Sequence, residues 1–283
     1  MSHARKRWIV IILACLAALV CRPLMQQVQS LDGGAGISVL LSPGIGMALA
    51  ITLAVLLIAA AVGVVAARFC GPHVGLLAAG LPLVWVSLGM GTIADLLKAG
   101  EALDRSGASV LWTLTIETAL LGVAVCLIAY LVYLASPDQW RRDVSAPGNA
   151  ASGIGVLIAL VVAGVGVWII ARSELPGQVL AACWIGGILG GLAARVAAPT
   201  ASTLAFVLGI VLLGVIGQIA GAVTDGPQAL AEANAGRLWE LSRPLPLTYA
   251  AAALVAAPMG SAWGRSLTSQ VHHERSHKGP GTT

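Results

Sequence analysis

The chain has 283 residues, of which 58% are hydrophobic and only 10% are charged. Soluble domains carry about 25% charged residues, so the composition excludes an ordinary soluble enzyme or binding domain. The 16 basic and 12 acidic residues leave a net charge of +4. This charge does not indicate nucleic-acid binding, because the basic residues gather on alternate connections between apolar stretches.

Eight apolar stretches of 17 to 28 residues follow one another along the chain. A helix that crosses the hydrocarbon core of a bilayer needs about 20 apolar residues, and its main-chain polar groups must be paired within the segment. We therefore predict an all-α membrane protein, a bundle of about eight transmembrane helices that forms a single domain over residues 8–264. The stretches are Trp8–Leu24, Gly44–Ala67, Pro72–Met90, Ala108–Ala135, Gly153–Ala171, Gly177–Ala194, Thr200–Thr224 and Leu245–Gly264.

The first stretch follows a basic N-terminus, residues 1–7, and resembles a signal peptide in this respect. Its apolar part before Cys15 is short for a signal peptide, so we expect an uncleaved first helix. Residues 265–283 predict a disordered tail. The five cysteines show no CxxC spacing, which indicates neither a disulfide framework nor a metal site.

The charged residues predict the orientation. Alternate connections assign ten basic and three acidic residues to the side that holds both termini, a net charge of +7, and six basic and eight acidic residues to the other side, a net charge of −2. Basic residues concentrate on cytoplasmic connections. We therefore expect a multi-pass protein of the bacterial inner (plasma) membrane with both termini in the cytoplasm.

A duplication is one interpretation of the chain. The motif AARxxxP follows the second and the sixth stretch, at Arg68 and Arg195. Two halves, residues 8–135 and 153–264, would then be parallel four-helix repeats related by an axis along the membrane normal. The alternative is coincidence, since Ala-Ala-Arg is common in an alanine-rich chain.

Two outer segments, residues 92–107 and 227–244, follow the third and the seventh stretch. Apolar residues recur on one face of each segment, which predicts short amphipathic helices in the plane of the membrane interface.

Glu117 and Gln218 form a possible intramembrane polar site. Glu117 is the one carboxylate well inside a stretch, and a charged residue there must be paired, protonated or turned to a cavity. It predicts either a proton or cation site or a structural contact, such as an ion pair with Arg105 or Arg172. Gln218 predicts an interhelical hydrogen bond or a pore-lining side chain.

Small and rigid residues mark further positions. Glycines create flat helix faces that allow close packing, within the chain or between copies of it. They are Gly186, Gly187, Gly190, Gly191, Gly217 and Gly221. Pro82 and Pro258 remove main-chain donors within the third and eighth stretches and predict kinks. Arg68 and Arg195 are interpreted as anchors of cytoplasmic turns, or alternatively as binding sites for an anionic headgroup.

Three functions stay open. The scarcity of intramembrane polar groups favours an accessory or structural membrane component. A small-solute or ion transporter or channel is the second, supported by Glu117, Gln218 and the repeat, and a lipid-modifying enzyme is the third. No cofactor or metal is predicted; the expected partners are the lipid bilayer and either further copies of the chain or a membrane complex.

Overall fold

The computed structural model describes residues 3–28, 38–137 and 150–277, with side chains within residues 8–268. The described residues form α-helices and short 3-10 turns, and no strand. Most of the connection between the two predicted halves, residues 138–149, lies outside the described residues. The long helices are α1 (His3–Met25), α2 (Ile45–Cys70), α3 (Pro72–Ser87), α5 (Gly107–Ala135), α7 (Ala150–Ile170), α8 (Pro176–Ala197), α9 (Thr203–Thr224) and α11 (Pro246–His277).

Each predicted stretch coincides with one of these helices, so the helical prediction is confirmed. Six of them, α1, α2, α5, α7, α8 and α9, are long and apolar enough to cross a membrane. The prediction of about eight spans is thus supported for six within the described residues. The protein is a membrane-embedded helical bundle.

The other two long helices depart from the requirements for a span for different reasons. Helix α3 has only 16 residues, which is about 24 Å of helix against a hydrocarbon core of roughly 30 Å. Helix α11 contains polar residues among its alanines, and it continues to His277, where the sequence predicts a tail without regular structure.

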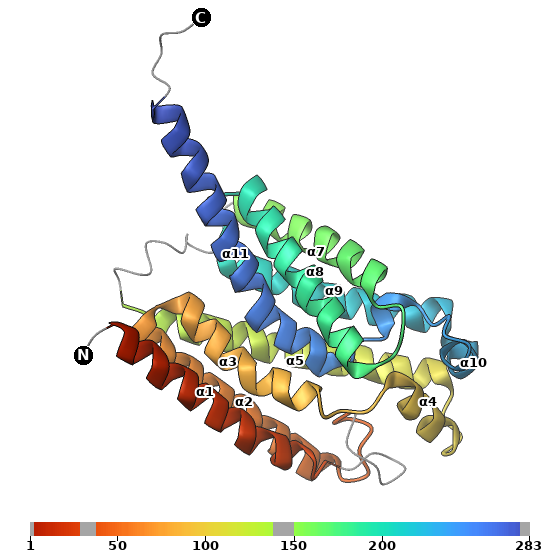
Figure 1. The fold of residues 1–283 in the computed structure, drawn as a ribbon. Helices are drawn as coiled ribbons and strands as arrows, with labels where there is room; N and C mark the ends of the chain where they lie inside the picture. Colours follow the sequence, from red (N-terminus) through yellow and green to blue (C-terminus); the bar gives the residue numbers. More distant parts are fainter. Residues whose placement is uncertain (1–2, 29–37, 138–149, 278–283) are drawn as a thin grey trace, which may run out of the picture.

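Helix α11 forms the centre of the bundle. It packs against α3, α5, α8 and α9, and residues 246–258 are all buried. Because this part of α11 faces protein on every side, it does not need the strongly apolar surface that contact with lipid demands. Its last turns extend past the bundle toward the C-terminus (Figure 1).

Glycines on α8 allow close packing within the chain on two sides. A Cβ atom at Gly186 or Gly190 would lie within 3 Å of main-chain oxygens of α7. At Gly187 and Gly191 it would meet α11 equally closely. The predicted flat faces are therefore covered inside one chain, whereas Gly217 of α9 faces a loop, as described below.

The two ends of the bundle differ. The start of α1 and the end of α11 lie at one end, here called the terminal end, and the short helices α4 (Ile93–Glu101) and α10 (Ala229–Asn234) lie at the other, the loop end (Figure 1). Helices α4 and α10 contact each other and α5. Both predicted outer segments thus contain a helix, and a capping box between Thr92 and Asp95 begins α4. In the second segment, η1 (Gly226–Gln228) and η2 (Glu240–Ser242) flank α10.

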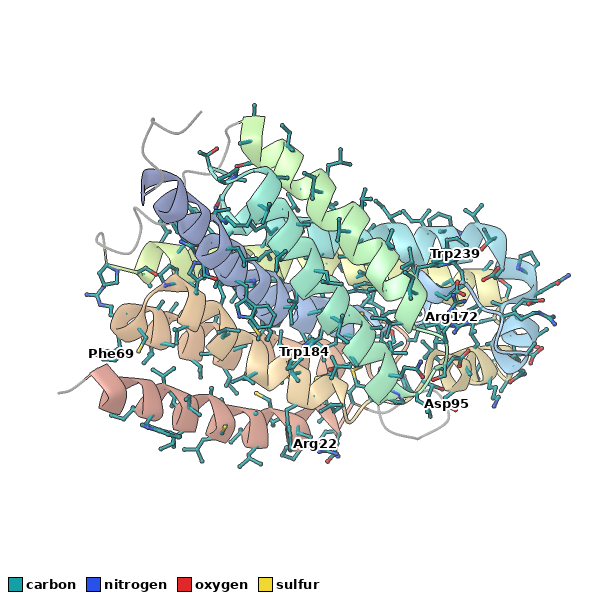
Figure 2. All side chains as sticks on the ribbon, turned by 45° about the horizontal axis from the view of Figure 1, so that its top comes forward. Arg22, Phe69, Asp95, Arg172, Trp184 and Trp239 are labelled. Atoms are coloured by element: carbon teal, nitrogen blue, oxygen red, sulfur yellow. The ribbon has the colours of Figure 1, made fainter. Side chains whose placement is uncertain are left out.

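Exposed aromatic residues lie near both ends of the bundle, at positions that sequence reasoning did not single out. Such aromatic belts are typical of proteins at the two membrane–water interfaces. Figure 2 shows Phe69 at the terminal end and Arg172 at the loop end, where the guanidinium group stacks 5.2 Å from the ring centre of Trp168. The exposed aromatic residues are Trp8, Phe69, Tyr130 and Trp263 near the terminal end and Trp85, Trp112 and Trp168 near the loop end.

Candidate functional site

Glu117 lies on α5 with its side chain turned into the protein and only 4% exposed. Its carboxylate accepts hydrogen bonds from Ser38 Oγ and from the main-chain N–H groups of Val39 (3.0 Å) and Leu40 (3.2 Å). Consecutive N–H groups that converge in this way form a concave site for an anion. Glu117 therefore binds the segment that leads into α2.

The alternative partners of Glu117 are placed elsewhere. Arg172 forms an ion pair with Glu240 at 3.3 Å, and Arg105 is exposed at the loop end. The predicted ion pair of Glu117 with Arg105 or Arg172 is therefore absent among the described residues, and main-chain N–H groups of the loop bind the carboxylate instead.

Gln218 lies on α9 and is fully buried. Its side-chain Nε2 donates to the carbonyl oxygens of Ser242 (3.1 Å) and Pro244 (2.8 Å), in the segment that leads into α11. Gly217 makes this contact close, because a Cβ there would lie 2.4 Å from the carbonyl oxygen of Leu241. Gln218 thus binds a loop rather than another long helix. Its Oε1 atom has no partner among the described residues.

Gly221 lies one turn beyond Gly217 on the same face of α9. A Cβ at Gly221 would lie 2.5 Å from the Cβ of Ser242. The two glycines therefore make room for the loop that Gln218 binds.

Arg195 at the end of α8 is only 2% exposed, and all five of its N–H groups have neutral acceptors. Two go to the carbonyl oxygens of Pro199 (2.7 Å) and Ala201 (2.9 Å), and the others go to the hydroxyl oxygens of Thr203 and Ser261. A ring contact adds to these bonds, since the guanidinium carbon lies 5.0 Å from the ring centre of Phe206. Arg195 therefore joins the end of α8, the start of α9 and α11.

Arg68 does not repeat this arrangement and is exposed. The reason is the length of the turn that follows. Helix α2 ends at Cys70 and α3 begins at Pro72, so only Gly71 separates them. After Arg195, five residues separate α8 from α9 and offer free carbonyl groups.

Arg243 is a fourth residue of this kind, and sequence reasoning missed it. Its side chain is 4% exposed and donates to the carbonyl oxygens of Ala171 (2.7 Å), Gly236 (2.9 Å) and Leu238 (2.8 Å). In the sequence it is one of several loop charges, and no local pattern distinguishes it from the exposed Arg237.

Glu117, Gln218, Arg195 and Arg243 are here called the four loop-binding residues. Each forms hydrogen bonds with main-chain groups that are not paired within a helix. Such groups need a partner when a loop is buried. The structure does not bring Glu117 and Gln218 together: they bind different segments, and neither lines the cavities discussed below. Where α5, α9 and α11 meet, the space between Thr118, Val211 and Tyr249 is too small for a water molecule.

The described residues contain no group of three or more His, Cys, Asp or Glu side chains that could hold a metal ion. An open surface hollow of about 290 Å³ lies beside Asp225 and Glu232 at the loop end. Both carboxylates have partners, because Asp225 accepts from the N–H of Trp239 at 2.7 Å and Glu232 pairs with Arg237 at 2.9 Å. The hollow therefore offers no free acid or base.

Comparisons with known proteins add no function: no family model matches the chain, and neither a curated protein nor a solved structure matches it.

Proposed function

We propose that this protein is an accessory, structural component of a membrane with no transport path or reaction of its own. The observation that supports this proposal is the use of its buried polar groups. The four loop-binding residues form their hydrogen bonds with the chain's own loops and helix ends. A transporter needs such groups free to face a solute.

We further propose that all eight long helices span the membrane. Successive long helices run in opposite directions between the terminal end and the loop end (Figure 1). Helix α3 reaches across because residues 88–91 extend it before α4 begins, and α11 is shielded from lipid over its apolar half.

The terminal end is proposed to face the cytoplasm of a bacterial cell, on the basis of the +7 against −2 charge distribution. Reporter fusions after Gly148 and after Thr283 should then both give a cytoplasmic signal. A periplasmic signal from either fusion would contradict the orientation, and opposite signals from the two would contradict the even number of spans.

The parallel repeat also belongs to the proposal. In this repeat α3 corresponds to α9, and α5 corresponds to α11. The contact of α3 with α11 then has a counterpart in the contact of α9 with α5, and both contacts are extensive. The correspondence is incomplete within each half. Helix α2 packs along α3, whereas α8 touches α9 only slightly.

The accessory role predicts an assembly. When native membranes are solubilised in a mild detergent, native electrophoresis should show the protein in a complex larger than the purified chain. The purified chain in the same detergent is the control, because it corrects for the bound detergent and lipid. A chain that migrates alone from native membranes, and conducts ions in reconstituted vesicles, would instead support the transporter.

A further inference from the structure

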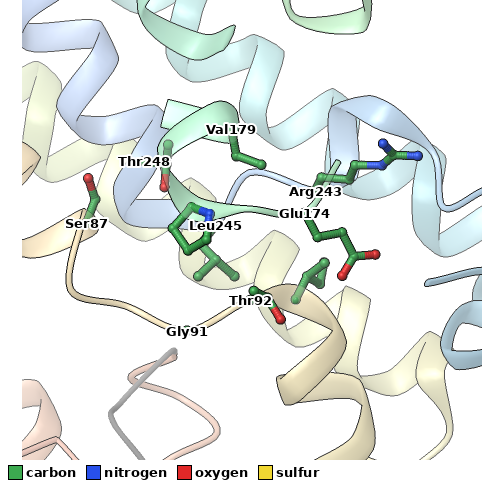
Figure 3. Close-up of a pocket in the computed structure, with 10 residues that line it drawn as sticks. Ser87, Gly91, Thr92, Glu174, Val179, Arg243, Leu245 and Thr248 are labelled. Carbon is green, nitrogen blue, oxygen red and sulfur yellow. The ribbon is translucent and has the colours of Figure 1, made fainter. Parts of the chain in front are cut away.

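A small cavity lies at the loop end, between elements that are far apart in the sequence. The turn between α3 and α4, the loop between α7 and α8 and the start of α11 enclose it (Figure 3). Its volume is about 10 Å³, roughly the space that one water molecule needs. Ser87, Thr92 and Thr248 line it together with Glu174 and Arg243.

Glu174 is the one carboxylate in the wall of this cavity. It lies beside the start of α4, because Thr92 and Ile93 line the same cavity. Its Oε1 atom is buried and has no hydrogen-bond partner among the described residues. A buried carboxylate oxygen without a donor is costly as an anion, whereas a protonated carboxyl group is itself a donor.

Arg243 faces the same cavity but does not form a hydrogen bond with Glu174. Each hydrogen bond that the structure gives Arg243 goes to a main-chain carbonyl, at Ala171, Gly236 or Leu238. Its guanidinium group is therefore hydrogen-bonded to the surrounding loops, and it affects Glu174 only through its positive charge.

The charges around Glu174 act in opposite directions. Burial raises the pKa of Glu174 above its ordinary value of 4.5, and the negative charge of Asp95 on α4 adds to this effect. Arg243, the N–H of Ala94 and Lys98 lower the pKa, but burial outweighs them. The carboxyl group is thus more readily protonated here than in water.

We propose that Glu174 is a proton-binding site that couples α4 to the loop between α7 and α8. In the protonated form the carboxyl group is uncharged, and the loop stays packed on the start of α4. In the ionised form Oε1 needs water, and the contact loosens. The inference rests on this cavity alone and does not depend on the accessory role.

The sign of the pH dependence follows from the raised pKa. The folded protein binds this proton more tightly than the unfolded chain does, so the contribution is complete below about pH 4.5 and is lost as the pH rises through the folded pKa. The apparent melting temperature of the wild type should therefore fall over this interval.

Two measurements on the full-length protein in lipid nanodiscs test the proposal. Thermal unfolding across about pH 4 to pH 8 compares the wild type with Glu174→Gln, which imitates the protonated group. We expect Glu174→Gln to remove the fall and to melt higher than the wild type at the upper pH. Glu101→Gln is the matched control, since Glu101 lies exposed at the end of α4, away from the cavity that Glu174 lines, and it should keep the wild-type slope.

Hydrogen exchange of the wild type gives a readout that does not depend on a variant. After correction for the intrinsic rate, amides in the first turn of α4 should lose protection several-fold as the pH rises, while those of α5 keep theirs. A wild-type slope retained in Glu174→Gln, or α4 protection that is constant with pH, would overturn the proposal.

Discussion

Glu117→Leu should destabilise the folded protein by about 3–5 kcal/mol, because each buried donor that loses its acceptor costs about 1–3 kcal/mol. Three donors lose theirs, the hydroxyl of Ser38 and the N–H groups of Val39 and Leu40. Glu117→Gln keeps the shape of the side chain and one acceptor oxygen, and it should lower the free energy of unfolding by about 1–2 kcal/mol. Unfolding of the purified variants in mixed micelles measures the difference.

Ala119→Leu is the control for Glu117→Leu, because Ala119 lies exposed on the same helix at nearly the same depth. It adds an apolar side chain toward lipid and should leave stability within about 0.5 kcal/mol of the wild type. Equal stability of Glu117→Leu and Ala119→Leu would show that Glu117 binds no loop. Loss of a transport activity in Glu117→Gln without loss of stability would favour the transporter.

Arg195→Met should cost a similar amount, about 3–5 kcal/mol, since hydrogen bonds to charged groups contribute about 1.5–3 kcal/mol each and are not additive. The substitution keeps the apolar stem but leaves the carbonyl groups of Pro199 and Ala201 buried without a donor. Arg195→Lys should lie in between, because an ammonium group has three donors on one atom and cannot reproduce the planar fork. Thermal unfolding in detergent measures both variants.

Arg68→Met provides the matched comparison. The two arginines occupy the same place in the AARxxxP motif, but Arg68 is exposed, so its loss should change stability by no more than about 0.5 kcal/mol. Equal effects of Arg68→Met and Arg195→Met would contradict the structural difference between the two turns.

The positions of the long helices could be predicted because each helix is determined by its own run of apolar residues. Twenty apolar residues in succession leave a helix as the only structure that pairs its own main-chain groups in lipid. The limits of that rule appear at α11. Its surroundings, and not its composition, decide how much of it is buried, and surroundings are a property of the assembled bundle.

The partners of the buried polar residues could not be predicted for the same reason. The position of Glu117 in the sequence shows that it needs a partner, but Ser38 lies 79 residues away and carries no sign of the contact. Arg195 and Arg68 look alike in the sequence because both lie in the same motif, although the turns that follow the two arginines differ. A turn with exposed carbonyl groups follows one of them, and a single glycine follows the other.

A double-mutant cycle between Ser38 and Glu117 tests most directly whether the buried polar groups of this bundle serve its own loops. The cycle compares the unfolding free energies of Ser38→Ala, Glu117→Gln and the double variant with that of the wild type. Residues in direct contact couple by about 0.5–3 kcal/mol, and we expect a coupling of at least about 1 kcal/mol. If the two changes are additive within about 0.3 kcal/mol, Glu117 is not engaged with this loop, and the structural interpretation of the site is wrong.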